Sequence, residues 1–160
     1  MGDSLSAQLV SYLDEDTVIV CVGTDKCIAD CLGPIVGSIL KEKEIDIPIY
    51  GTLDNPIHAL NMHEQLNFIK NKHPNAKIIG VDACLGIEEE IGMIRIRDYA
   101  IHPGKGVGKE LPEVGIASII GIVDSNPEIL FSRCIRLSFV MAMAKQIVEI
   151  IIKAIKDTGK

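Results

Sequence analysis

Aromatic residues are scarce in this 160-residue chain, which has no tryptophan, three tyrosines and three phenylalanines. Because 48% of its residues are nevertheless hydrophobic, the core must be built from aliphatic side chains. Isoleucine and valine dominate the apolar runs, as expected of strands that are covered on both faces. A chain of this length suits one domain that buries roughly two-thirds of the surface of its unfolded state. We therefore predict a single domain over residues 1–160.

Positive charge is also in short supply. Sixteen basic residues stand against 22 acidic ones, which gives a net charge of −6. Nucleic-acid binding needs clustered lysine and arginine, so this balance argues against direct contact with DNA or RNA. No apolar run reaches the roughly 18 residues of a membrane helix, and the first residues lack the basic and apolar regions of a signal peptide. We expect a cytoplasmic protein that does not bind membranes.

The cysteine count does not suit a disulfide framework. Five cysteines are an odd number, and in a chain of cytosolic character they are expected to be small, buried, structural side chains. One alternative is a zinc site, because Cys27, Cys31 and Cys84 could join His102 as ligands. A nucleophilic pair of Cys84 and His102 is a further alternative with less support.

Strand-like and helix-like segments alternate along the chain. Apolar runs predict strands at 17–23, 47–51, 77–81 and 114–124, and an alternating pattern predicts a half-exposed edge strand at 92–98. Helical periodicity and start signals predict helices at 5–13, after Asp30, from Asn55-Pro56 to His73, and from about Glu128 to Lys156. Gly33 and Gly37, one turn apart, would let the second helix approach its neighbour closely. This order predicts an α/β fold: a three-layer α/β/α sandwich of the phosphorylase/hydrolase-like kind, with a mostly parallel sheet and an antiparallel edge.

Two aspartates stand where predicted strands end. Asp30 lies in "GTDKCIADCLGP" (residues 23–34), between a strand and a helix, and Asp82 ends the apolar run "AKIIGVD". Because sites in such sheets form at the carboxyl ends of the strands, we expect the two carboxylates to share one crevice. Asp30 has the alternative role of capping the helix. Asp82 has no obvious helix to cap, and burying its carboxylate is costly unless it is paired or needed for function.

A glycine-rich segment, "HPGKGVGKELPE" at 102–113, suits neither a helix nor a strand. Its lysines and glycines resemble a phosphate loop, but the spacing is one residue short and no helix follows promptly, so we reject nucleotide binding. A flexible loop that covers a substrate fits better, with Lys105 as a supporting residue. His102 is a metal ligand, a general base or simply an exposed histidine.

Three segments, taken in order, resemble the bacterial spore germination proteases. "VGTDKCIADCLGP" is similar to their first active-site segment, and "IIGVDACLG" is similar to their second, a strand that ends in Asp-Ala. "IHPGKGVGKELPEVGIASIIGIVD" resembles their later glycine-rich loop and the strand after it.

Within that group, "YGTLDNPIHALN" together with "DACLG" looks most like the shorter YyaC-type sporulation proteins. The resemblance covers about residues 17–150 and extends, more distantly, to the hydrogenase-maturation peptidases.

The resemblance implies an endopeptidase with two catalytic aspartates, which fall on Asp30 and Asp82. One carboxyl group would hold a proton while the other activates water, and the sequence leaves open which does which. Thr24 and Asp25 would support the pair, and no cofactor is expected. The implied substrates are proteins, in particular small acid-soluble spore proteins, in the forespore or spore interior. The oligomeric state stays open, with a homo-oligomer as one alternative.

Two other functions remain open at this point. In a metal-dependent peptidase of the maturation type, Asp30, Asp82 and His102 would hold a divalent ion. In a non-enzymatic sporulation factor, the protease fold would serve only to bind a partner. The presence of both aspartates favours an enzyme.

Overall fold

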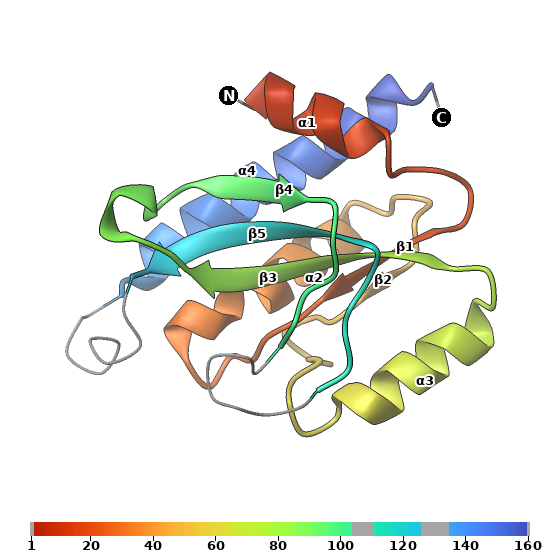
Figure 1. Cartoon of the computed structure of the whole chain (residues 1–160), viewed down its shortest axis with the longest axis horizontal. Coiled ribbons are helices and arrows are strands. Elements are labelled where there is room, and N and C mark those ends of the chain that lie inside the picture. Colours follow the sequence, from red (N-terminus) through yellow and green to blue (C-terminus); the bar gives the residue numbers. More distant parts are fainter. Residues whose placement is uncertain (1, 104–110, 126–134, 160) are drawn as a thin grey trace.

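A computed structural model describes residues 2–103, 111–125 and 135–159. These residues form a five-stranded sheet in the order β2-β1-β3-β5-β4 (Figure 1). The strands are β1 (Thr17–Cys21), β2 (Ile49–Tyr50), β3 (Lys77–Leu85), β4 (Ile94–Arg97) and β5 (Ala117–Asp124). All neighbouring pairs are parallel except β4 and β5, which are antiparallel. The mostly parallel sheet with one antiparallel edge is therefore confirmed.

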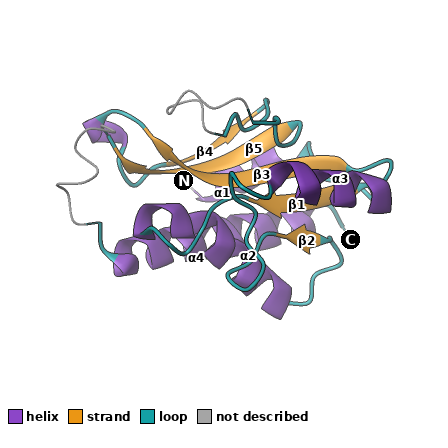
Figure 2. Cartoon of the chain, turned by 90° about the horizontal axis from the view of Figure 1, so that it is seen from below, coloured by secondary structure: helices purple, strands orange, loops and turns teal. Residues whose placement is uncertain are grey.

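Helices cover both faces of this sheet. They are α1 (Gly2–Val10), α2 (Leu32–Glu42), α3 (Met62–Lys72) and α4 (Leu137–Asp157), with 3₁₀ turns at Ile28–Cys31 and Glu88–Glu90. Helices α1, α2 and α4 share one aliphatic cluster with the sheet, whereas α3 packs into a second cluster. Figure 2 shows α2 and α4 together on one side of the strands. The predicted three-layer sandwich and its aliphatic core are confirmed.

Two glycines bring α2 against the backbone of the strand ends. A Cβ added to Gly33 would lie 2.1 Å from the carbonyl oxygen of Val22, and one added to Gly37 would lie 1.9 Å from that of Gly51. No larger residue fits at these distances, so the close approach predicted from the glycine spacing is confirmed. The consequence is that the start of α2 is fixed beside the end of β1.

The third strand is longer than predicted. It continues past residue 81 to Leu85, because β5 runs beside it and pairs Asp82 with Ile120 and Cys84 with Ile122. Asp82 therefore lies inside a strand rather than at its end. Since side chains alternate along a strand, Asp82 points to the same face as Ile78, which belongs to the cluster under α3.

The third helix begins later than the Asn55-Pro56 signal indicated. Ile57 forms a parallel bridge with Val22 and is 1% exposed, which keeps this segment extended along the sheet. The side chain of Asn61 then holds the following turn, accepting a hydrogen bond from the His58 N–H and donating one to the Pro56 carbonyl. Helix α3 starts only at Met62.

Other predicted boundaries shift by a few residues. Strand β1 ends at Cys21 and β2 is limited to two residues. Strand β5 starts at Ala117, because Val114 bridges to Ile101 and Gly115 turns the chain with a φ of +90°. Helix α4 starts at Leu137, and residues 128–134 of the predicted helix lie outside the described residues. None of the helices in the described ranges has the length and apolar character to cross a bilayer.

Candidate active site

The segment after β1 folds back on itself to place Asp30 beside the sheet. Gly23, whose φ is +147°, donates its N–H to the Ile57 carbonyl, and Thr24 donates its N–H to the Asp30 carbonyl at 3.1 Å. A Cβ on Gly23 would meet that same Asp30 oxygen at 2.2 Å, so the loop closes only around a glycine. A 3₁₀ turn that ends at Cys31 then leads into α2.

Asp30 does not cap a helix. The residue before α2 is Cys31, and no side chain caps the helix there. Among the described residues, no hydrogen bond or ion pair ends on the Asp30 carboxylate, although partial burial raises its pKa above the ordinary value. The capping alternative is therefore wrong, and this carboxylate is available for chemistry.

Asp82 lies on the neighbouring strand. Its strand is joined to the end of β1 through the Val22 N–H, which donates to the Val81 carbonyl at 2.8 Å. Burial raises the pKa of the Asp82 carboxyl to about 8, a hydrogen bond from the Ala83 N–H to Oδ1 (2.8 Å) opposes that rise, and the charge of Asp30 adds to it. Asp82 therefore holds its proton at neutral pH in the folded protein.

Both aspartates line one open hollow of about 330 Å³, which lies beyond the carboxyl end of β1 and beside Asp82 in the second half of β3. Its polar side chains, besides the aspartates, are those of Thr24, Lys26 and His58. Its apolar lining comes from Val22, Ala59, Leu60, Met62, Pro103 and Leu111. The predicted shared crevice is present, and it holds two carboxyl groups with perturbed pKa values in a mainly apolar setting, which is a frequent feature of active sites.

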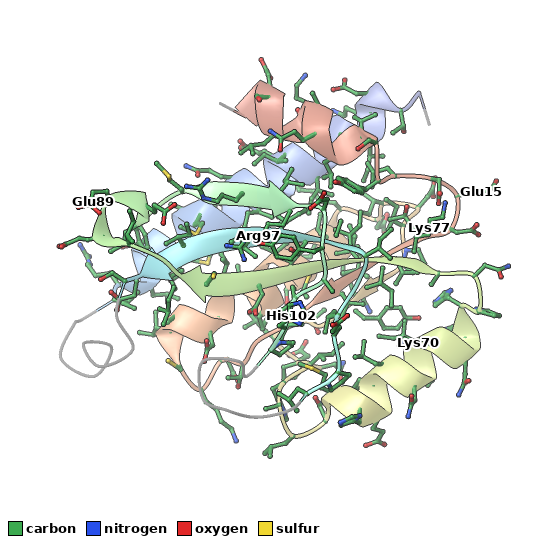
Figure 3. The ribbon with its side chains drawn as sticks, viewed as in Figure 1. Glu15, Lys70, Lys77, Glu89, Arg97 and His102 are labelled. Atoms are coloured by element: carbon green, nitrogen blue, oxygen red, sulfur yellow. The ribbon has the colours of Figure 1, made fainter. Side chains whose placement is uncertain are left out.

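Of the residues predicted to support the aspartates, some line the hollow and others do not. Thr24 lines the hollow, and its Oγ1 accepts the Lys26 N–H at 3.3 Å. Asp25 is exposed and is not part of the hollow's lining. His102, labelled in Figure 3, belongs to the connection between β4 and β5, and its Nδ1 lies 3.6 Å from Glu113 Oε1. Lys105 lies outside the described residues.

The connection between β4 and β5 reaches the hollow from both of its described ends. Figure 1 shows it crossing in front of β5 and β3, and Ile101 and Val114 pack into the cluster that includes α3. Pro103 and Leu111, which flank the undescribed residues 104–110, both line the hollow. This position suits the substrate-covering role predicted for 102–113, which stays a prediction.

No metal-ligand set is assembled in the part of the chain that the structure describes. No group of three or more histidine, cysteine or acidic side chains there is arranged to hold a metal ion. The set Asp30, Asp82 and His102 is therefore not brought together among the described residues, and His102 is not part of the hollow's lining. Fitting a divalent ion to the aspartate pair would need ligands from elsewhere.

Of the four cysteines that the structure describes, Cys21 and Cys31 are buried as predicted, Cys84 is partly buried, and Cys27 is exposed, so the prediction of buried cysteines is wrong for Cys27. The Cys31 thiol donates to the Cys27 carbonyl, and the Cys84 thiol donates to the Leu85 carbonyl. Burial raises the thiol pKa of both Cys21 and Cys31, so at neutral pH neither is a thiolate. This arrangement does not support the zinc set or a thiol nucleophile.

The sequence did not point to two of the residues that line the hollow, His58 and Leu60. The helix predicted from Asn55-Pro56 to His73 includes both His58 and Leu60. Both lie in the turn before α3, His58 inside the hollow's lining and Leu60 at its edge with 86% of its surface exposed. The sequence feature that could have placed them correctly is Asn61, because asparagine also favours the start of a helix and this one stands five residues after Pro56.

Comparisons with known proteins agree with this fold. The family model described as "Protein of unknown function (DUF1256)" matches residues 1–150. Over 148 residues the chain is 42% identical to the uncharacterized protein YyaC of Bacillus subtilis (strain 168), covering 91% of this chain and 72% of that protein. A solved structure, the NiFe hydrogenase maturation protease HycI from Thermococcus kodakarensis KOD1, is similar with a TM-score of 0.53. That match covers 90% of this chain and 98% of HycI at 20% identity, so it shows a shared fold.

Proposed function

The chain belongs to the DUF1256 family, and from this premise we propose that it is a peptidase that cleaves peptide bonds with an aspartate pair. The observation that carries the proposal is the hollow in which Asp30 and Asp82 lie together with unequal environments. The fold shared with a maturation protease supports a hydrolase. Two neighbouring carboxyl groups of unequal pKa are the usual basis of paired acid and base catalysis.

The environments of the two aspartates support a division of roles. Asp82, with a pKa of about 8, is the acid: its proton forms a hydrogen bond with the carbonyl oxygen of the scissile bond. Asp30 is more exposed and is the base: its carboxylate takes a proton from water as the water oxygen bonds to the carbonyl carbon. When the C–N bond breaks, the departing amine takes the proton that Asp30 received.

We further propose that the substrates are spore proteins. The support is the relationship to YyaC, together with the resemblance of three segments to the spore germination proteases. Small acid-soluble spore proteins are the first candidates, and the forespore or spore interior is the matching location.

The test is incubation of the purified protein with extracted spore proteins, with fragments identified by mass spectrometry. Asp30→Asn and Asp82→Asn should each abolish cleavage, because an amide is nearly the shape of the acid but neither ionises nor donates an acidic proton. The double variant should be hardly worse than either single one, since residues that act as a unit have non-additive effects. Asp98→Asn, at an exposed carboxylate just after β4, is the matched control and should cleave normally.

Two outcomes would redirect the assignment. Inhibition by a chelator, reversed by added metal, would favour the metal-dependent alternative, and His102 would be tested next. Absence of fragments, combined with normal sporulation of both single variants, would leave the non-enzymatic sporulation factor as the better description.

A further inference from the structure

The hollow that holds the aspartates has an apolar wall that the proposed chemistry does not use. Val22, Met62 and Leu111 form its inner part, and Met62 is almost completely buried. Leu60 extends the wall to the rim, where 86% of its surface is exposed. A single exposed leucine is unremarkable on a protein surface. An exposed leucine that continues a buried apolar wall beside two carboxyl groups has the setting of a ligand site, in which a mostly apolar lining surrounds a few polar groups.

The turn that presents Leu60 is held by hydrogen bonds on both sides. The Leu60 N–H donates to His58 Nδ1 at 3.2 Å, and the His58 N–H donates to Asn61 Oδ1 at 2.9 Å. Behind the turn, Ile57 is buried and paired with Val22 of the sheet. The backbone of Leu60 is therefore fixed relative to the strand ends, and so to Asp82.

The chemistry of the hollow selects its occupant. The hollow has one acidic and one basic side chain, Asp30 and Lys26, so its charges do not select an anion, and the protonated carboxyl of Asp82 requires a hydrogen-bond acceptor such as a peptide carbonyl. The apolar wall requires a hydrophobic group on the same ligand. A volume of about 330 Å³ is at the small end of ligand pockets, which suits one side chain with its backbone.

A second hollow next to the first offers room for the rest of an extended ligand. It has a volume of about 350 Å³, shares His58 with the first, and is lined mainly by polar groups, including Tyr50, Thr52, Asn55 and Gln65. These groups match a peptide backbone and polar side chains. The two hollows together fit a peptide strand with one hydrophobic residue.

Resting on the proposed function, we infer that the wall of Val22, Leu60, Met62 and Leu111 is the specificity pocket for a bulky aliphatic residue next to the cleaved bond. Leu60 is its specificity-determining residue, because it is the member that a substrate can cover without any change in the core.

The test uses a randomised library of end-blocked peptides, with the products sequenced by mass spectrometry. The wild-type protein should enrich leucine, isoleucine, valine or methionine at one position flanking the cut. Leu60→Ala should lower kcat/KM for these peptides by about tenfold or more, as expected for lost methyl groups in a hydrophobic pocket. Leu60→Lys should move the preference at that position toward acidic residues. Ile87→Ala, at a side chain that is 61% exposed and outside the hollow, should leave the profile unchanged.

The outcomes separate this inference from the proposed function. Cleavage without an aliphatic preference, or a Leu60→Ala profile like that of Ile87→Ala, would overturn the specificity pocket and leave the peptidase standing. If neither this library nor the extracted spore proteins are cleaved, the peptidase fails, and retention of the same library on immobilised protein decides the pocket. Selective retention of aliphatic peptides that Leu60→Lys abolishes would support it, and unselective retention would overturn it.

Discussion

At the scale of one residue, the buried carboxyl of Asp82 makes the free energy of unfolding depend on pH. Its carboxyl is protonated in both the folded and the unfolded chain below the unfolded pKa of about 3.9. Between that value and the folded pKa of about 8, the unfolded chain loses the proton while the folded protein keeps it. The contribution of Asp82 to stability is therefore present in acid and is lost as the pH rises through 8.

This linkage predicts the behaviour of Asp82→Asn in thermal unfolding. Because asparagine does not titrate, the Tm of the variant should rise relative to the wild type from about pH 4 to pH 8 and level off above it. The measurement is a series of melting curves across this range. Asp98→Asn should keep a nearly constant offset. A constant offset for Asp82→Asn as well would show that Asp82 titrates normally.

At the scale of the element, the contact between α2 and β1 positions Asp30. The helix begins two residues after Asp30, and Gly33 places its first turn against the Val22 carbonyl. The segment between β1 and α2 is a closed loop in which the Thr24 N–H donates a hydrogen bond to the Asp30 carbonyl. A shift of the helix start would therefore move the base of the proposed catalytic pair.

Gly33→Ala is expected to destabilise the protein by about 1–3 kcal/mol, because the new methyl group would lie 2.1 Å from a backbone oxygen that cannot easily move. Chemical denaturation measures this difference in the free energy of unfolding. Gly2→Ala, also in a helix but with open space around it, should change stability by no more than about 1 kcal/mol. Equal effects of the two variants would contradict the close contact.

The same scale explains what the sequence could and could not predict. Buried strands and the glycines of α2 were predictable, because each pattern can be recognised within a short stretch of sequence. The late start of α3 was not, because it depends on Ile57 pairing with a strand 35 positions earlier. The sequence identifies Asp82 as a candidate although the predicted strand ends too early. It does not identify His58 and Leu60, because the predicted helix begins too early and includes them.

At the scale of the whole molecule, the candidate site belongs to both layers that flank the sheet. Asp30 is positioned by α2, which packs into the larger cluster with α4, whereas Met62 and Leu111 come from the α3 side. The sheet joins the two clusters, because side chains of β1 and β3 point alternately into one and the other. The geometry of the hollow therefore depends on both faces being folded at once.

This arrangement predicts that the chain unfolds as one cooperative unit. Ile147, in the cluster of α2 and α4, and Ile69, in the cluster of α3, are both 0% exposed. Ile147→Ala and Ile69→Ala should each cost about 2–5 kcal/mol and should each move the same single transition down by at least about 4 °C. Calorimetry checks this by comparing the calorimetric and van't Hoff enthalpies, which are equal in a two-state transition.

An early, separate transition in Ile69→Ala alone would show that the α3 face unfolds independently. The single domain expected from the chain length would then be wrong, and the Leu60 wall would be the part of the site that opens first.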